Sequence, residues 1–230
     1  MPTVTLKRPS FAPDPLSAVL FDFDGVLAMT IEDNFKVWRK VLGQVGVTLD
    51  RTEYMLLEGR RATEMLKVIL GKAGVKTASI DELIDHKRRE YEASNEFRLY
   101  EGVPEVLRAL KAARIKLGLV SGGSKARIIA TFPPDLMKLF DAVVCGEDAH
   151  ESKPSPIPYR TAATSMGVPF AECLVVENAP LGIQAARAAG MTCVAITSTL
   201  EEKYLVEAHA IVATMLEFGR AFGELTQAGL

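Results

Sequence analysis

The sequence predicts an α/β protein: a doubly wound parallel-sheet core, Rossmann-like, with an inserted all-helical domain. Short runs rich in β-branched apolar residues recur between stretches of helical periodicity. These runs are apolar throughout and do not alternate, which is typical of parallel strands covered on both faces. Residues 30–99 hold no such run. Strand–helix alternation with one helical interruption therefore favours a doubly wound core that carries a helical insertion.

Six segments have the pattern of buried parallel strands. Each is short, apolar and followed by glycine or polar residues. They are SAVLF (17–21), IKLGLV (115–120), DAVVC (141–145), CLVVE (173–177), TCVAI (192–196) and AIVAT (210–214).

Helices are predicted between the strands, and some of their ends can be read directly. Pro104 and Pro180 stand at favoured first positions of helices, and Gly190 closes the second of these helices. Within residues 30–99, apolar side chains recur at helical spacing from Phe35 to Val45 and again from Met65 to Leu70. We therefore expect the insertion to be helical from end to end.

The predicted organisation has three parts. Residues 1–16, with four prolines, are expected to form a loose N-terminal arm. Residues 17–29 and 100–230 form the core domain, and residues 30–99 form a helical cap. With 48% hydrophobic residues, a chain of 230 residues can bury a sizeable core.

Composition excludes several functional classes. The net charge of −2 and a pI of about 6.0 do not favour a nucleic-acid partner. No apolar stretch approaches the roughly 20 residues that span a membrane, and the N-terminus lacks the apolar segment of a secretory signal. The cysteines, Cys145, Cys173 and Cys193, are odd in number and lie in apolar runs. They are expected to be reduced and buried in a cytoplasmic protein, either a monomer or a homodimer.

Polar residues follow four of the predicted strands. The first strand leads into Asp22 and Asp24, and the second into Ser121 and Gly122. Lys153 lies in the loop after the third strand, and the fourth ends in Glu177–Asn178. In an open parallel sheet, ligands bind beyond the carboxyl ends of the strands. Carboxylates with a lysine and a glycine-rich turn at such an edge suit Mg²⁺ and a phosphoryl group.

Asp22 and Asp24 explain why an apolar run ends in two acids. Side chains two residues apart on a strand point the same way. Both carboxylates would therefore approach one reacting centre, and they would repel each other unless a cation lies between them. One can attack phosphorus, and the other can transfer a proton.

Four segments resemble the motifs of the haloacid dehalogenase-like phosphotransferases: FDFDGVL, LVSGGS, SKPSPIPY and LVVENAPLGIQAARAAG. The helical insertion resembles the cap of their β-phosphoglucomutase and phosphoglycolate-phosphatase branch. This resemblance implies a Mg²⁺-dependent phosphatase that acts on a small phosphorylated metabolite through an aspartyl-phosphate.

The resemblance also implies residue roles. Asp22 is the nucleophile and a metal ligand, and Asp24 is the general acid/base whose backbone carbonyl binds Mg²⁺. Ser121 and the Gly122 amide hold the phosphoryl group. The other implied roles are charge neutralisation for Lys153, metal binding for Glu177 and Asn178, and substrate contact from the cap for Arg60, Lys87 and Asn34.

Two departures from the family pattern keep alternatives open. Asn178 stands where the family often has a carboxylate that binds Mg²⁺, so either Asn178 or Glu177 is the direct ligand. Asn34 stands where the mutase branch usually has a histidine that couples proton control to cap closure, which favours hydrolysis over phosphoryl transfer to a sugar. A β-phosphoglucomutase-like mutase and a non-catalytic sugar-phosphate binder are the alternative functions.

Overall fold

A single parallel sheet forms the centre of the molecule, which we describe from a computed structural model covering residues 7–76, 79–94 and 96–223. Its six strands lie in the order β3-β2-β1-β4-β5-β6. All six predicted strands are present, and the predicted fold class is confirmed. The strands are β1 (Ala18–Phe21), β2 (Lys116–Val120), β3 (Ala142–Val144), β4 (Cys173–Glu177), β5 (Thr192–Ile196) and β6 (Ala210–Val212).

Both faces of the sheet are buried, which accounts for the uninterrupted apolar strands. Successive strand residues enter two different hydrophobic clusters: Leu20 and Val175 enter one, whereas Phe21 and Val176 enter the other. All four side chains are fully buried. Because each strand residue faces a covered surface, polar residues are confined to the strand ends.

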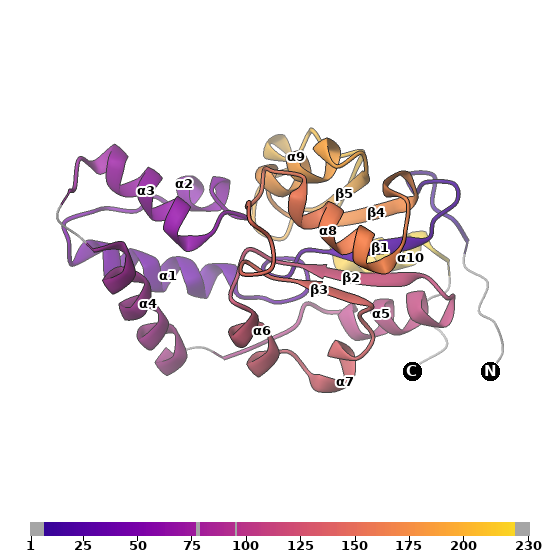
Figure 1. Cartoon of the computed structure of the whole chain (residues 1–230), viewed down its shortest axis with the longest axis horizontal. Helices are drawn as coiled ribbons and strands as arrows, with labels where there is room; N and C mark the ends of the chain where they lie inside the picture. The colour runs from indigo at the N-terminus through magenta and orange to yellow at the C-terminus, as the bar shows by residue number, and fades with distance from the viewer. Residues whose placement is uncertain (1–6, 77–78, 95, 224–230) are drawn as a thin grey trace.

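Helices cover the two faces of the sheet (Figure 1). α8 and α9 pack on one face, and α5 and α10 pack together with β2 and β6 on the other. The helices and short helical turns of the core are α5 (Val103–Ala112), α6 (Lys125–Thr131), α7 (Pro134–Met137), α8 (Ile157–Met166), α9 (Pro180–Ala188), α10 (Met215–Ala221), η1 (Phe170–Glu172) and η2 (Glu202–Tyr204).

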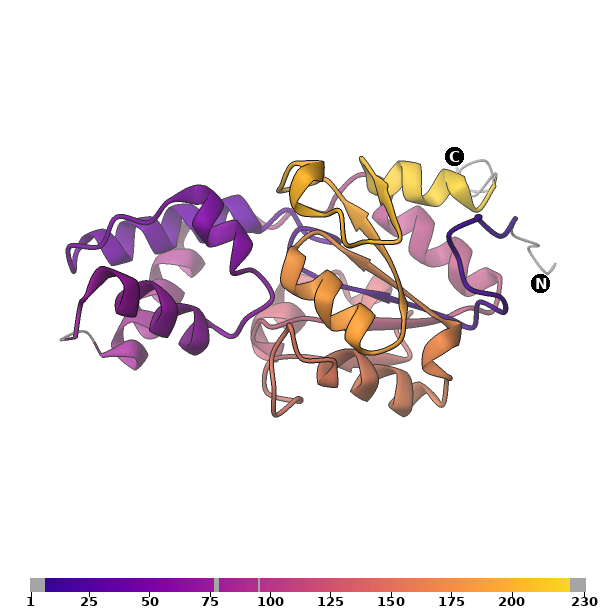
Figure 2. The same cartoon turned by 90° about the horizontal axis from the view of Figure 1, so that it is seen from above.

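Four helices between β1 and α5 form a separate group, which we call the cap (Figures 1 and 2). Within the cap, α1 packs against α2 and α4, and α3 packs against α4. The predicted helical insertion is therefore present. Its helices are α1 (Ile31–Gly43), α2 (Arg51–Leu56), α3 (Ala62–Ala73) and α4 (Ile80–Ser94).

The chain enters and leaves the cap along two antiparallel segments. Ala28 forms a β-bridge with Leu99, and the Met29 amide donates to the Arg98 carbonyl over 2.9 Å. The Tyr100 amide donates to the Leu27 carbonyl over 3.1 Å. These two segments join the cap to the core, while the domain boundaries at residues 30 and 99 stay predictions.

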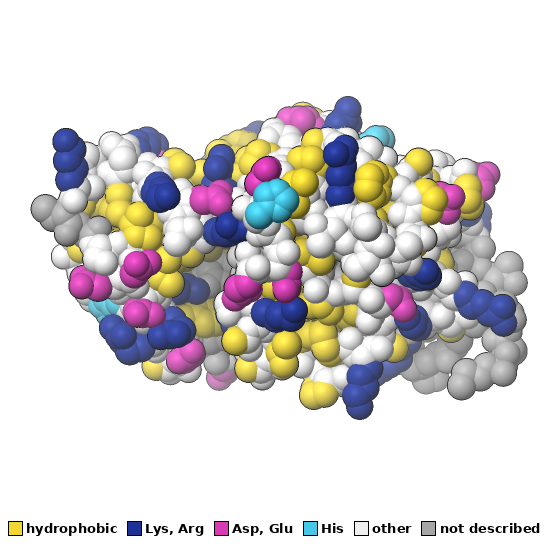
Figure 3. All heavy atoms as spheres, in the orientation of Figure 1, with side chains coloured by type: hydrophobic (Ala, Val, Ile, Leu, Met, Phe, Trp, Pro, Cys, Tyr) yellow, Lys and Arg dark blue, Asp and Glu magenta, His cyan; other side chains and the backbone are white. Residues whose placement is uncertain are grey.

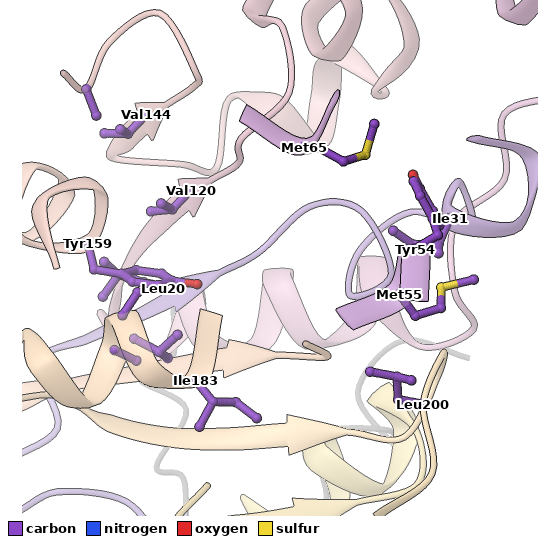
Figure 4. Packing of buried hydrophobic residues seen from close by; sticks show 14 of the residues in the cluster. Leu20, Ile31, Tyr54, Met55, Met65, Val120, Val144, Tyr159, Ile183 and Leu200 are labelled. Carbon is purple, nitrogen blue, oxygen red and sulfur yellow. The ribbon is translucent and has the colours of Figure 1, made fainter. Parts of the chain in front are cut away.

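One hydrophobic cluster continues from the sheet into the cap (Figure 4). Leu20, Tyr159 and Ile183 belong to its core part, and Ile31 and Met55 to its cap part. The cap therefore rests on the core through shared apolar packing as well as through its two connecting segments.

The N-terminal arm differs from the predicted loose segment over residues 7–16. The Phe11 ring centroid lies 6.3 Å from that of Phe218 and 6.4 Å from that of Phe222. Ala12 is buried, and the Lys7 amide donates to the Phe222 carbonyl over 2.9 Å. An aromatic side chain between the prolines anchors this part of the arm to α10, and proline content alone did not reveal it. Residues 1–6 of the predicted arm lie outside the described residues.

Acidic and basic side chains are interspersed on the face shown in Figure 3, in keeping with the near-neutral net charge. In the described part of the chain, none of the helices has the length and apolar character needed to span a membrane. The three cysteines are free and buried, as predicted.

Candidate active site

The parallel register brings the predicted residues together at one edge of the sheet. Phe21 of β1 is paired with Leu119 of β2 and with Val176 of β4. The residues that follow β1 and β2, and the last residue of β4, are therefore neighbours. They are Asp22, Ser121 and Glu177, and the loop before α8 adds Lys153.

Lys153 links two carboxylates inside the protein. Its Nζ donates to Asp22 Oδ1 over 2.5 Å, to Glu177 Oε1 over 2.7 Å and to the Val120 carbonyl over 3.3 Å. The side chain is only 1% exposed. Burial acts to lower the pKa of Lys153, but the two carboxylates outweigh it and raise the pKa, so the ammonium stays charged.

Asp22 is surrounded by opposing influences. Burial raises its pKa well above the usual value, Lys153 lowers it, and Glu177 raises it again. Two carboxylates thus share one ammonium in a buried place. The resulting negative charge favours a further cation beside Asp22.

Glu177 is fully occupied by donors from the protein. Its carboxylate accepts from Lys153, from the Tyr159 hydroxyl over 2.6 Å, and from the backbone amides of Asn178 and Ala179 over 2.9 and 3.3 Å. Gly182 leaves room for it, since a Cβ there would overlap with Glu177 Oε1. The structure therefore places Glu177 as the residue that holds Lys153.

The Asp24 carboxylate is held by a residue that the sequence reasoning did not select. Arg127 Nη1 and Nη2 donate to its two oxygens over 2.9 and 2.6 Å. The Thr30 hydroxyl donates to Oδ1 over 2.5 Å, and the Ser121 hydroxyl lies 3.4 Å from Oδ2. Burial acts to raise the pKa of Asp24, but Arg127 and Thr30 outweigh it and hold the pKa below its usual range.

A polar chain leads from Asp24 into the cap. Asn34 donates from Nδ2 to the Thr30 carbonyl over 2.9 Å, and its Oδ1 accepts from Lys87. The Lys87 ammonium lies 4.2 Å from the ring centroid of Tyr91. Burial lowers the pKa of Lys87 to about 8.

A cavity of about 690 Å³ lies between this edge of the sheet and the cap. Asp22, Asp24, Ser121 and Gly122 line its floor, and the cap supplies its other walls. Glu58 lines it as well, and burial raises the pKa of Glu58 to about 7. The cap residues lining the cavity include Asn34, Trp38, Tyr54, Leu57, Glu58, Arg60, Met65, Ile84, Lys87 and Tyr91.

The cap touches the phosphate-binding turn directly. A Cβ on Gly122 would lie 3.0 Å from the Gly59 carbonyl oxygen and 3.2 Å from that of Arg60, so a side chain at 122 would crowd the cap backbone. The Ser152 hydroxyl donates to Glu64 of the cap over 2.5 Å. The turn that would hold phosphate is therefore covered by the cap.

The side chains fit a hard divalent cation. The Asp22 carboxylate, the Asp24 carbonyl and the Asn178 amide oxygen supply the donor type that Mg²⁺ prefers. Gly25, at a φ of +86°, turns the chain, and a Cβ there would overlap with Asn178 Nδ2. Its missing side chain lets Asn178 lie against the Asp24–Gly25 peptide. Within the described ranges no cluster of three His, Cys, Asp or Glu side chains is arranged to hold a metal, so the donor set relies on an amide and a backbone carbonyl beside Asp22.

Every site residue selected from the sequence lies at this edge or on the cavity wall, while the roles assigned to them stay predictions. Arg127, Glu58 and the link from Tyr159 to Glu177 were missed. Only Arg127 had a usable signal, because it lies in the first turn of the helix that starts beyond the β2 tip.

Comparison with known proteins identifies the family. The pattern of the haloacid dehalogenase-like hydrolases matches residues 19–196. The chain belongs to this family, in its capped branch that includes β-phosphoglucomutase. It is a phosphatase of that family by homology.

Particular relatives cover most of the chain. It is 30% identical over 203 residues to validoxylamine A 7′-phosphate phosphatase of Streptomyces hygroscopicus subsp. limoneus, covering 86% of this chain and 93% of the relative. It is 32% identical over 194 residues to β-phosphoglucomutase of Bacillus subtilis (strain 168), covering 79% and 83%. CbbY from Rhodobacter sphaeroides, solved with phosphate, has a TM-score of 0.75 and 26% identity, with 90% of this chain and 99% of that chain covered.

Proposed function

We propose that the protein is a Mg²⁺-dependent phosphatase that hydrolyses a small phosphorylated metabolite through an aspartyl-phosphate on Asp22. One observation carries this proposal. The Asp22 carboxylate is bonded to the buried Lys153 and lines the floor of a cavity beside Asp24 and the Ser121–Gly122 turn. These are the groups that phosphoryl transfer to a carboxylate requires, in one place.

The first half-reaction forms the phosphoenzyme. A carboxylate oxygen of Asp22 attacks phosphorus, and the bond from phosphorus to the ester oxygen breaks. Asp24, protonated at that moment, gives its proton to the departing oxygen, so that the alcohol leaves neutral.

The second half-reaction returns the enzyme to its starting state. Asp24, now a carboxylate, accepts a proton from a water molecule whose oxygen attacks phosphorus. The bond from phosphorus to Asp22 breaks, which releases inorganic phosphate and the Asp22 carboxylate. The proton then passes from Asp24 to water when Arg127 pairs with the carboxylate again.

Lys153, Ser121 and the Gly122 amide are the protein's donors to the transferring phosphoryl oxygens. Asp22, the Asp24 carbonyl and Asn178 would hold the cation. When bound, Mg²⁺ neutralises charge on the phosphoryl group and on Asp22. We assign the third ligand to Asn178 because Glu177 already accepts four hydrogen bonds.

Hydrolysis is proposed over mutase chemistry because of Asn34. Its amide joins Lys87 to Thr30, and Thr30 donates to Asp24. An amide does not exchange a proton near neutral pH, so no proton passes along these contacts between the cap and Asp24. The alternative is a β-phosphoglucomutase-like reaction, favoured by the kinship with the mutase of B. subtilis.

The substrate is proposed to be a phosphorylated sugar or a related metabolite. The validoxylamine A 7′-phosphate phosphatase, whose name specifies such a substrate, is among the relatives. A cavity of about 690 Å³ accommodates a molecule of this size.

The test is phosphate release from a panel of phosphorylated metabolites, with and without Mg²⁺. Asp22→Asn should abolish release, and Asp24→Asn should lower kcat by about 10²–10⁴-fold. Asp135→Asn is the matched control, because Asp135 forms an exposed ion pair with Arg108 on the core surface, away from the cavity lining. Turnover by Asp22→Asn near the wild-type rate would remove the nucleophile assignment.

A second assay separates hydrolysis from mutase chemistry. The protein is given β-glucose 1-phosphate, Mg²⁺ and a trace of the 1,6-bisphosphate. Inorganic phosphate, or no reaction with this sugar but hydrolysis of others, supports the phosphatase. Rapid formation of glucose 6-phosphate without phosphate would establish the mutase instead.

A further inference from the structure

Arg127 and Asp24 form a bidentate ion pair in the wall of the cavity. The two guanidinium nitrogens reach both carboxylate oxygens, over 2.9 and 2.6 Å. The Arg127 side chain is 20% exposed and that of Asp24 is 14% exposed. A bidentate arginine–carboxylate ion pair that is largely shielded from water is among the stronger polar contacts in proteins.

This contact competes with the proposed work of Asp24. As acid and base, the Asp24 carboxylate must reach the departing ester oxygen and then a water molecule. Arg127 occupies both oxygens, and Thr30 adds a third donor. Turnover therefore requires Arg127 to leave Asp24, and a guanidinium that leaves a carboxylate inside a cavity needs another acceptor.

The charges lining the cavity indicate what this acceptor is. The phosphoryl group already has donors in Lys153, Ser121 and Gly122. Once Asp22 and Asp24 are engaged in the chemistry, the remaining carboxyls of the lining are two and its basic side chains are four. The carboxyls are Glu58 and Glu92, and the basic residues are Arg60, Lys87, Arg127 and Arg88, the last of which is largely exposed and paired with Asp85 over 2.9 Å.

We infer that Arg127 is a specificity residue that holds Asp24 at rest and transfers its guanidinium to a second anionic group of the substrate. The preferred substrates then carry a phosphate or carboxylate in addition to the phosphate that is cleaved. When a phosphomonoester has no second anionic group, Arg127 stays paired with Asp24 and the substrate is hydrolysed slowly. This inference rests on the proposed phosphatase function.

The experiment compares substrates that differ in the second anion. One pair is 3-phosphoglycerate and glycerol 3-phosphate, and the other is fructose 1,6-bisphosphate and fructose 1-phosphate. Initial phosphate release gives kcat and KM for the wild type and for Arg127→Met, which keeps the length of the side chain without its charge. Arg127→Lys keeps the charge without the fork, and Arg108→Met is the control at an exposed ion pair elsewhere.

The wild type should prefer the second anion by about tenfold to a hundredfold in kcat/KM in at least one pair, the value of a charge-assisted contact. Arg127→Met should bring the preference close to one. It should lower kcat/KM for the substrate with the second anion more than for the uncharged-bodied substrate, and chiefly through KM. Arg127→Lys should retain part of the preference, and Arg108→Met should retain all of it.

Several results would overturn the inference. Equal kcat/KM within both pairs for the wild type would do so without any variant, even if Arg127→Met failed to fold. Loss of activity on every substrate in equal proportion in Arg127→Met would show that Arg127 only supports Asp24. If the wild type releases no phosphate from any ester, the proposed function itself fails, whereas turnover without preference removes only the role of Arg127.

Discussion

Lys153 should contribute to the stability of the fold as well as to catalysis. The ionised Asp22 beside it should instead lower the free energy of unfolding. Lys153→Met keeps most of the side-chain volume but leaves Asp22 and Glu177 buried together without their shared ammonium. Removing one partner of a buried ion pair costs about 3–5 kcal/mol. For a chain of this length that corresponds to a fall in Tm of roughly 6–20 °C.

Asp22→Asn provides the contrasting perturbation in the same cluster. It leaves Lys153 and Glu177 as a balanced pair, whereas the wild type has two carboxylates for one ammonium. The pKa of Asp22 is raised in the fold, so its ionised form is less stable there than in the unfolded chain. The penalty grows as pH rises above the usual value of 3.8, and the uncharged amide of the Asp22→Asn variant lacks it.

The assay is thermal and denaturant unfolding at pH 7.5 in EDTA, so that a bound cation does not stabilise the wild type. Lys153→Met should unfold well below the wild type, and Asp22→Asn at the same temperature or above it. The advantage of Asp22→Asn should shrink at pH values near 3.8. The reasoning is refuted if Lys153→Met is as stable as the wild type, or if Asp22→Asn loses about 2 kcal/mol or more at pH 7.5.

Three further outcomes follow from single contacts. Tyr159→Phe removes the hydroxyl that donates to Glu177 and should lower the free energy of unfolding by about 1.5–3 kcal/mol in urea titrations; a loss near zero would mean that the bond is replaceable. Glu58→Gln should gain roughly 1–3 kcal/mol over the wild type between pH 4.5 and pH 8, because burial raises the Glu58 pKa to about 7 and its ionised form is disfavoured; a pH-independent difference contradicts this. Asn178→Asp should lower the half-saturating Mg²⁺ concentration for activity, since it returns a negative charge beside Asp22. An unchanged Mg²⁺ titration would place position 178 outside the metal site.

The strands and the residues at their ends could be predicted because the information is local. An apolar run that is followed by Asp22 predicts a buried strand with a polar residue at its end. The apolar run that ends in Glu177 predicts the same. Parallel pairing then brings such tips to one edge whatever the length of chain between them. The fold class and the gathering of site residues follow from that single rule.

The contact between Arg127 and Asp24 could not be predicted from the sequence. Asp24 lies 103 residues away from Arg127, and no short pattern connects an arginine on a helix with one particular carboxylate. Only the direction of the first helical turn after Ser121 would have pointed to it. The Thr30 hydroxyl and the Arg127 guanidinium both hold the Asp24 carboxylate, and no pattern around Asn34 indicated either contact.

Glu177 and Phe11 illustrate two other limits. The donors on Glu177 are Lys153, Tyr159 of α8 and the backbone amides of Asn178 and Ala179, so its role as an anchor for Lys153 depends on three-dimensional packing. Phe11 lies among prolines, and composition predicted a loose arm. Aromatic contacts of Phe11 with Phe218 and Phe222 outweigh that tendency, and a contact between distant parts of the chain has no signature in either segment.

The pairing of Ala28 with Leu99 has a consequence for how such a chain can vary. The two ends of the cap lie opposite each other. The cap is therefore an insertion whose ends are held close together by this pairing, which we call its neck. The entropy of closing a loop changes slowly with its length, by about 0.6 kcal/mol for each doubling. Where cap helices do not share the hydrophobic cluster of the core, they can therefore be lengthened or shortened beyond this neck at small cost to the sheet, and the substrate range can diverge while the strand ends that carry out the chemistry stay the same.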